Sequence, residues 1–104
     1  STAKTIVDGL PSELRARDYG DTGYKGDGFV ARAKSEKDLE DRLIESLSDI
    51  DGVKRAESYE SVGMLTTNKG VRLRLKDGGG YNLTIRTTTA PGRFAVDINK
   101  ASSR

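Results

Sequence analysis

The most regular pattern in the chain is a stripe of aliphatic residues with helical spacing between Ser35 and Gly52. The apolar positions of this stripe are Leu39, Leu43, Ile44, Leu47 and Ile50. A helix with 3.6 residues per turn places them on one face, and the positions between them are mostly acidic. The Ser35 hydroxyl can accept from the N–H of Asp38, and Gly52 suits the residue that follows a helix. The pattern predicts an amphipathic helix over residues 36–51.

After Gly52 the apolar residues alternate with polar ones, which is typical of β-strands that bury one face. The apolar set of this alternation comprises Val71, Leu73, Leu75, Tyr81, Leu83 and Ile85. The glycine-rich segment 77–80 divides the set and predicts the turn of a hairpin. Two more strands are expected. One covers residues 55–67 and ends in a turn at residues 68–70, and the other covers residues 93–99 after Pro91-Gly92.

We therefore expect an α+β fold in which one amphipathic helix packs on one face of a four-stranded antiparallel sheet. The predicted core consists of Leu39, Leu43, Leu47, Ile50, Val71, Leu73, Leu75, Leu83, Ile85, Val96 and Ile98. The first third of the chain shows no comparable pattern, and residues 19–28 include four glycines. We expect residues 1–34 to form a poorly ordered or irregular segment with a flexible glycine-rich loop. Residues 35–104 are expected to form a single α+β domain.

The same alternation predicts a polar surface on the side of the sheet that the helix leaves open. Because side chains two positions apart share one face of a strand, the polar residues of the hairpin lie together. This predicted binding set consists of Arg72, Arg74, Lys76, Asn82, Thr84 and Arg86. Guanidinium groups beside amides and hydroxyls suit phosphate oxygens or the carboxylates of a partner protein. A solvated face without a partner fits the same pattern, because a sheet with one buried face needs polar residues outside.

Composition limits the chemistry that this surface can perform. The chain has 104 residues, the size of one domain, of which 34% are hydrophobic and 33% charged. It contains no cysteine and no histidine, which excludes disulfides, zinc-finger sites and histidine-based nucleophilic catalysis. We expect no metal, cofactor or catalytic site. The longest apolar run, Phe29–Ala31, is too short for a membrane span or a secretory signal, so a cytoplasmic protein without a membrane partner is expected.

Charge is distributed unevenly along the chain, although the formal net charge is only +2. Residues 1–52 carry eight basic and twelve acidic side chains, whereas residues 53–104 carry ten basic and four acidic ones. Such asymmetry favours association with nucleic acid or with an oppositely charged partner. The glycine-rich loop could become ordered on meeting such a partner, with Tyr19 and Tyr24 as contact residues.

Three functions fit this surface, and the sequence leaves the oligomeric state open. The first is non-catalytic binding of another macromolecule, such as a host protein or nucleoprotein complex, through surface charge. The second is a toxin-like ribonuclease without histidine. Its phosphate-holding residues would be Arg72, Arg74, Arg86 and Arg93, and its base would be Glu57, Glu60 or Tyr59. The third is a simple nucleic-acid-binding module on the basic sheet face, although that face has no aromatic residue on which bases could stack.

The hairpin region resembles short, uncharacterised proteins encoded by bacteriophages. The segments that carry this resemblance are VGMLTTNKGVRLRLKDG at residues 62–78 and YNLTI at residues 81–85, less than a quarter of the chain. The resemblance implies a small virus-encoded accessory protein in the host cytoplasm. Many such proteins bind and block a host machine, so it implies an inhibitor of a host nucleoprotein or defence complex. It implies no active-site residue.

Overall fold

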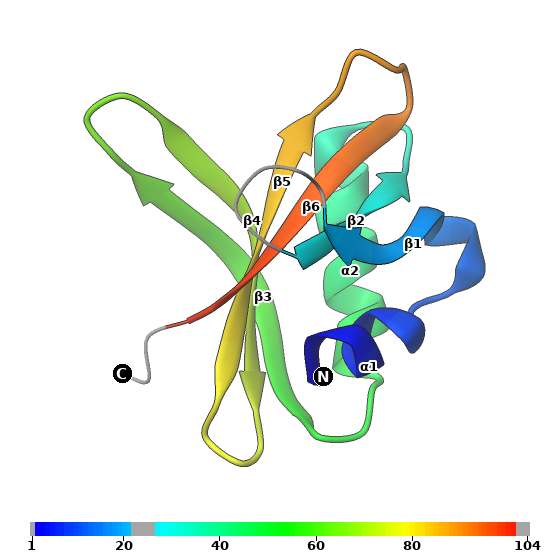
Figure 1. The fold of residues 1–104 in the computed structure, drawn as a ribbon. Helices are drawn as coiled ribbons and strands as arrows, with labels where there is room; N and C mark the ends of the chain where they lie inside the picture. The colour runs from blue at the N-terminus through cyan, green and yellow to red at the C-terminus, as the bar shows by residue number, and fades with distance from the viewer. Residues whose placement is uncertain (1, 22–26, 102–104) are drawn as a thin grey trace.

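A computed structural model describes residues 2–21 and 27–101 of the chain (Figure 1). Their elements, in chain order, are α1 (Thr2–Asp8), the 3₁₀ turn η1 (Ser12–Leu14), β1 (Arg15–Asp21), β2 (Asp27–Arg32), α2 (Glu36–Ser48), β3 (Val53–Val62), β4 (Thr67–Leu75), β5 (Gly80–Thr87) and β6 (Arg93–Lys100). The strands form one sheet in the order β1-β2-β6-β5-β4-β3, and every neighbouring pair is antiparallel. The fold is therefore α+β.

The prediction of four strands and one helix is wrong, because the described residues form six strands and two α-helices. The two missed strands, β1 and β2, come from the segment that was predicted to be irregular. β2 pairs with β6 from Gly28 to Arg32, so its partner strand supplies the order that its glycine-containing sequence does not indicate. Residues 22–26 of the predicted flexible loop lie outside the described residues. The division of the chain into units 1–34 and 35–104 stays a prediction.

The core lies between the sheet and the helices. Nine of the eleven predicted core residues are buried, and Ile50 and Leu75 are partly buried and pack against the same cluster. The N-terminal segment adds buried residues that the sequence pattern did not indicate. The larger ones among these are Ile6, Val7, Leu10, Leu14 and Phe29. These residues help a chain with few aliphatic side chains to assemble one continuous core.

Helix α2 begins as predicted and ends earlier. Ser35 Oγ accepts from the N–H of Asp38 at 3.0 Å, and the Asp38 carboxylate accepts from the N–H of Lys34 at 3.1 Å. The last helical residue is Ser48 rather than Asp51. Gly52 has a φ of +89°, a left-handed conformation that favours glycine after a helix. The chain then enters β3 two residues earlier than predicted.

The turn that the sequence predicted at residues 68–70 is wrong, because these residues belong to β4. The actual turn covers residues 63–66, where the N–H of Gly63 donates to the carbonyl of Thr66 at 2.8 Å. Gly70 serves a different purpose from the turn predicted for it. A Cβ at this position would collide with the main-chain carbonyl of Leu83 on β5, so glycine permits the close approach of two strands.

The sheet divides just beyond Gly70. β4 and β5 pair from Arg74–Gly80 to Gly70–Thr84, and past that point each strand stays with its other neighbour. We call this division the fork, and we call residues 60–69, the end of the β3–β4 hairpin beyond it, the arm. Figure 1 shows the arm and the β5–β6 hairpin pointing in different directions from a common centre. The arm contains no buried residue.

Candidate binding site on the helix-free face

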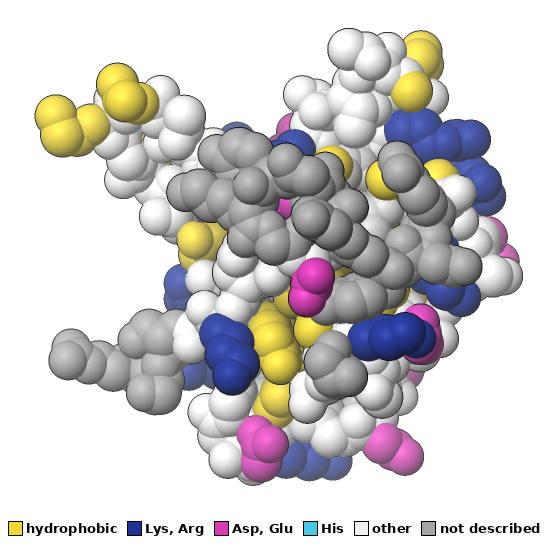
Figure 2. All heavy atoms as spheres, in the orientation of Figure 1, with side chains coloured by type: hydrophobic (Ala, Val, Ile, Leu, Met, Phe, Trp, Pro, Cys, Tyr) yellow, Lys and Arg dark blue, Asp and Glu magenta, His cyan; other side chains and the backbone are white. Residues whose placement is uncertain are grey.

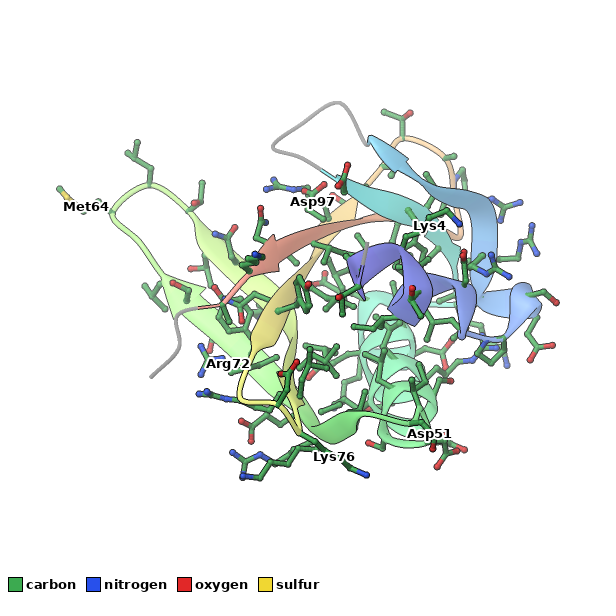
Figure 3. The ribbon with its side chains drawn as sticks, turned by 60° about the horizontal axis from the view of Figure 1, so that its bottom comes forward. Lys4, Asp51, Met64, Arg72, Lys76 and Asp97 are labelled. Atoms are coloured by element: carbon green, nitrogen blue, oxygen red, sulfur yellow. The ribbon has the colours of Figure 1, made fainter. Side chains whose placement is uncertain are left out.

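Helix α2 packs on β3, β4 and β5, and the predicted polar set lies mainly on the opposite side of these strands. The strand register and the alternation of side chains place five of its residues on this helix-free face. These residues are Arg72, Arg74, Asn82, Thr84 and Arg86. Figure 3 shows Arg72 on the side of the hairpin away from α2. The structure gives these five residues two different environments.

The first environment is a group of arginines on β3 and β4. Arg74 lies directly opposite Arg55, and Arg72 lies directly opposite Glu57. We call Arg55, Arg72 and Arg74 the arginine cluster. Its acidic neighbour is Glu57, whose Oε2 is 3.7 Å from the Nε of Arg55. The sequence analysis missed Arg55 because a register shift between Val53 and Arg55 breaks the alternation at the start of β3.

Arg72 is held between a ring and an amide. Its guanidinium carbon lies 4.9 Å from the centre of the Tyr59 ring, within the range of a cation–π contact. Its Nε donates to Asn82 Oδ1 at 3.4 Å. The helix-free face therefore carries an aromatic ring, which the sequence analysis did not place there. Tyr59 lies opposite Gly70, and only the true register of β3 against β4 reveals that it adjoins Arg72.

The second environment is a buried ion pair on β5 and β6. The Nε of Arg86 donates to Oδ2 of Asp97, and Asp97 is only 1% exposed. Thr84, directly opposite Asp97, is 7% exposed. A buried carboxylate is costly unless it is paired, so Arg86 is needed by the protein itself. Arg86 and Thr84 thus belong to a buried part of the structure, whereas a partner can reach Arg55 and Arg72.

The remaining predicted contact residues lie outside the arginine cluster or outside the side chains that the structure describes. Lys76 follows β4 in the turn to β5 and borders a cavity of about 290 Å³ beside α1. Tyr24 is outside the described residues, and for Tyr19 only the backbone, within β1, is described. The glycine-rich loop therefore contributes no described contact to the site.

The arrangement proposed for a ribonuclease is only partly assembled. Glu57 and Tyr59 adjoin Arg72, but Arg86 is paired with Asp97. Arg93 lies opposite Arg32 at the far end of β6. Glu60 borders a different cavity, with Glu40 of α2 and Ser58. The four arginines do not converge on one of the three candidate bases.

Three further observations concern the charges of the surface, membrane spans and metal sites. On the face shown in Figure 2, the visible Lys and Arg side chains form several separate groups rather than one continuous patch. None of the described helices is long and apolar enough to cross a membrane. Within residues 2–21 and 27–101, no group of three or more acidic side chains is placed to hold a metal ion.

Comparison with known proteins gives this site no precedent. No protein-family model matches the chain, and comparisons with curated proteins and with solved structures found no match. The resemblance of residues 62–85 to bacteriophage proteins stays a prediction.

Proposed function

We propose that this is a non-catalytic binding protein that engages an acidic surface of a partner protein through the arginine cluster. The observation that carries this proposal is the placement of Arg55, Arg72 and Arg74 on two adjacent strands of the helix-free face. Guanidinium groups bind carboxylates with two parallel hydrogen bonds, which gives both strength and a defined orientation. Tyr59 and Asn82 hold Arg72 in place, so less side-chain entropy is lost when it binds.

Two observations favour a protein over a nucleic acid as the partner. Arg72 covers one face of the Tyr59 ring, so the described part of this face offers a base less stacking surface than an open aromatic platform does. The same hairpin ends in three large apolar side chains that are almost fully exposed. Their exposed fractions are 76% for Val62, 102% for Met64 and 96% for Leu65. Exposed apolar anchors are typical of protein–protein interfaces, and these lie on the same hairpin as the arginine cluster, at its opposite end.

A protein of this kind acts by competition. It occupies a charged surface that the partner needs for another ligand, which requires complementary charge and contact area but no catalytic group. The partner class expected from the sequence is a host protein or nucleoprotein complex. An inhibitor of this type fits the resemblance to bacteriophage proteins, and the arginine cluster supplies its contact.

The experiment is a capture assay with matched charge reversals. The protein is immobilised and exposed to a bacterial lysate, and captured proteins are identified by mass spectrometry over a range of salt concentrations. We expect the variant R55E/R72E to lose the captured partner. The control K54E/K69E makes the same change in charge at two exposed lysines, and Lys69 lies on the other side of the same hairpin, beside Glu40 and Glu60. This control should retain the partner.

The alternative functions give different results in a second assay. Labelled RNA and DNA are incubated with the protein, and both retention and cleavage are measured. Salt-sensitive retention without cleavage would support a nucleic-acid-binding module, and cleavage would support the ribonuclease. Equal loss of the captured protein in R55E/R72E and K54E/K69E would contradict a role for the arginine cluster.

A further inference from the structure

The fork between β4 and β5 is a second surface feature, and the described residues that line it include none of the three arginines of the cluster. Beyond the pair Gly70–Thr84, residues 67–69 remain bound to β3 and residues 85–87 remain bound to β6. A groove of about 770 Å³ lies between these two segments. Figures 1 and 3 both show the arm diverging from β5 at this place. Two strand edges therefore face each other without pairing.

The main-chain groups that face the groove follow from the hydrogen-bond pattern. In antiparallel strands, pairs that exchange hydrogen bonds alternate with pairs whose N–H and C=O point outward. The bond from Gly63 N–H to Thr66 makes Val62–Thr67 an outward pair, so Thr67 directs its main chain away from β3. The bond from Ala101 N–H to Gly80 sets the β5–β6 pattern, in which Thr87 directs its main chain away from β6. Both residues point toward the fork.

The side chains that line the groove are mostly uncharged and able to form hydrogen bonds. Among the described residues, the lining includes four threonines and three asparagines. Its basic member is Arg86, which is paired with Asp97, and its acidic member is Glu36 at the start of α2. Tyr59 and Ile85 supply limited apolar contact. Such a lining suits a ligand that is recognised through its own amides and carbonyls.

We propose that the fork binds an extended peptide segment of a partner protein, which adds a strand to the sheet between β4 and β5. An extended peptide main chain presents N–H and C=O groups at the spacing of these two strand edges, as in other cases of strand addition. A phosphate-bearing ligand would meet one cation here, and that cation is already neutralised by Asp97. A second copy of the chain would offer the tip of its arm, but that tip is apolar and the groove is polar.

This site goes beyond the arginine cluster and is carried by different residues. Gly70 permits the two strands to approach closely at the closed end of the fork, and the arm forms one of its walls. A segment added here would run beside the arm, whose exposed tip would meet the body of the same partner. The fork would then select for main-chain geometry, and the arginine cluster would select for charge.

The test uses a random dodecapeptide library as the probe, selected on the immobilised full chain. Affinities of the selected peptides are measured by fluorescence polarisation for two double variants. T67P/T87P removes two of the N–H groups that face the fork, one from each wall, and by the bond pattern above neither N–H is paired with a neighbouring strand among the described residues. T67V/T87V removes the hydroxyls of the same residues but keeps both N–H groups. We expect at least a tenfold loss of affinity for the proline variant and less than a threefold loss for the valine variant.

The opposite results would overturn the proposal. These are a library that yields no binder, unchanged affinity in T67P/T87P, or equal losses in the two variants. If the proline variant does not fold, as judged by circular dichroism, N-methylated versions of a selected peptide replace it. Methylation of paired amides should then lower affinity at least tenfold, and unchanged affinity for every methylated version would contradict main-chain pairing.

Two further measurements distinguish this proposal from two alternatives, a second copy of the chain in the fork and a peptide bound at the arginine cluster. Light scattering coupled to gel filtration reports the oligomeric state, and a dimer that T67P/T87P dissociates would show that the occupant is a second copy rather than a partner peptide. Arg55 belongs to the arginine cluster and is not among the described residues that line the groove, so R55E should bind selected peptides as the unmodified chain does. Loss of peptide binding in R55E would place the peptide on the arginine cluster and overturn the fork as its site.

Discussion

The two walls of the fork are built from strands of one sheet, yet they are stabilised in different ways. On the β5–β6 side, Ile85 is buried in the core and Asp97 forms a buried ion pair with Arg86. On the other side, the arm contains no buried residue, and Met64 and Leu65 are almost fully exposed. One wall is fixed by packing and charge, whereas the other is held by pairing within its own hairpin.

This difference shows where an apolar residue is accounted for by its contribution to the stability of the fold. Apolar residues on the β5–β6 side contribute to the core, so their identity needs no further function. The apolar residues at the tip of the arm contribute nothing to the core, and exposed clusters of such residues usually mark an interaction site. We therefore infer that the apolar residues of the β5–β6 wall stabilise the fold and that those of the arm contact a partner.

The largest expected effect comes from breaking the fixed wall. D97N removes the charge that neutralises Arg86 and leaves a partly buried guanidinium without its ion-pair partner. We expect the free energy of unfolding to fall by about 3–5 kcal/mol, as for other buried ion pairs that lose one member. Urea unfolding monitored by circular dichroism measures this loss.

The control for D97N is an ion pair on the surface of the same face. E57Q removes the partner of Arg55, and both side chains of that pair are substantially exposed. The expected loss is about 0–1 kcal/mol, because exposed pairs are screened by solvent. Similar losses for D97N and E57Q would show that the two sides of the face do not differ as described.

A smaller effect is expected at the closed end of the fork. In G70A, the new Cβ would meet the main-chain carbonyl of Leu83, which cannot move without displacing β5. We expect a loss of about 1–3 kcal/mol, typical of overpacking, measured by urea unfolding. N68A, two residues away in the arm, should change stability by less than about 0.5 kcal/mol. An unaffected G70A would mean that β4 and β5 do not approach closely there.

The sequence predicted those parts of the fold that are determined by local pattern. Helix α2 has its cap, its apolar stripe and its final glycine within eighteen residues, so each signal supports the others. The hairpin of β4 and β5 is similarly local, since Leu73 and Leu83 alternate with polar residues across a glycine turn. The face opposite α2 follows from the same alternation.

The strands that the sequence missed depend on distant partners. β2 contains Gly28 and pairs with β6, which lies more than sixty residues later in the chain. No local pattern reports such a partner, and strand propensity depends strongly on context. The turn was misplaced for a related reason: Gly70 is required by its contact with Leu83, and a sequence does not distinguish this from a glycine required by a turn.

The sequence predicted on which side of the sheet the candidate site lies, but not which residues contact each other there. Strand parity placed Arg72 and Arg86 together, and both do lie on the helix-free face. Their roles differ because Asp97 lies beside one and Tyr59 beside the other. These neighbours come from other strands, so the difference becomes visible only once the register is known.

The smallest expected effect on stability concerns the tip of the arm. This prediction tests most directly the difference between the two walls of the fork. M64S/L65S replaces two side chains that are 102% and 96% exposed, so the folded protein loses no packing. We expect the free energy of unfolding to change by less than about 0.5 kcal/mol. The same variant should capture less of the partner found with the unmodified chain, because the apolar anchor is gone. A loss of stability above about 1 kcal/mol would show that the tip packs against the protein itself, and undiminished capture would show that the tip is not part of the interface.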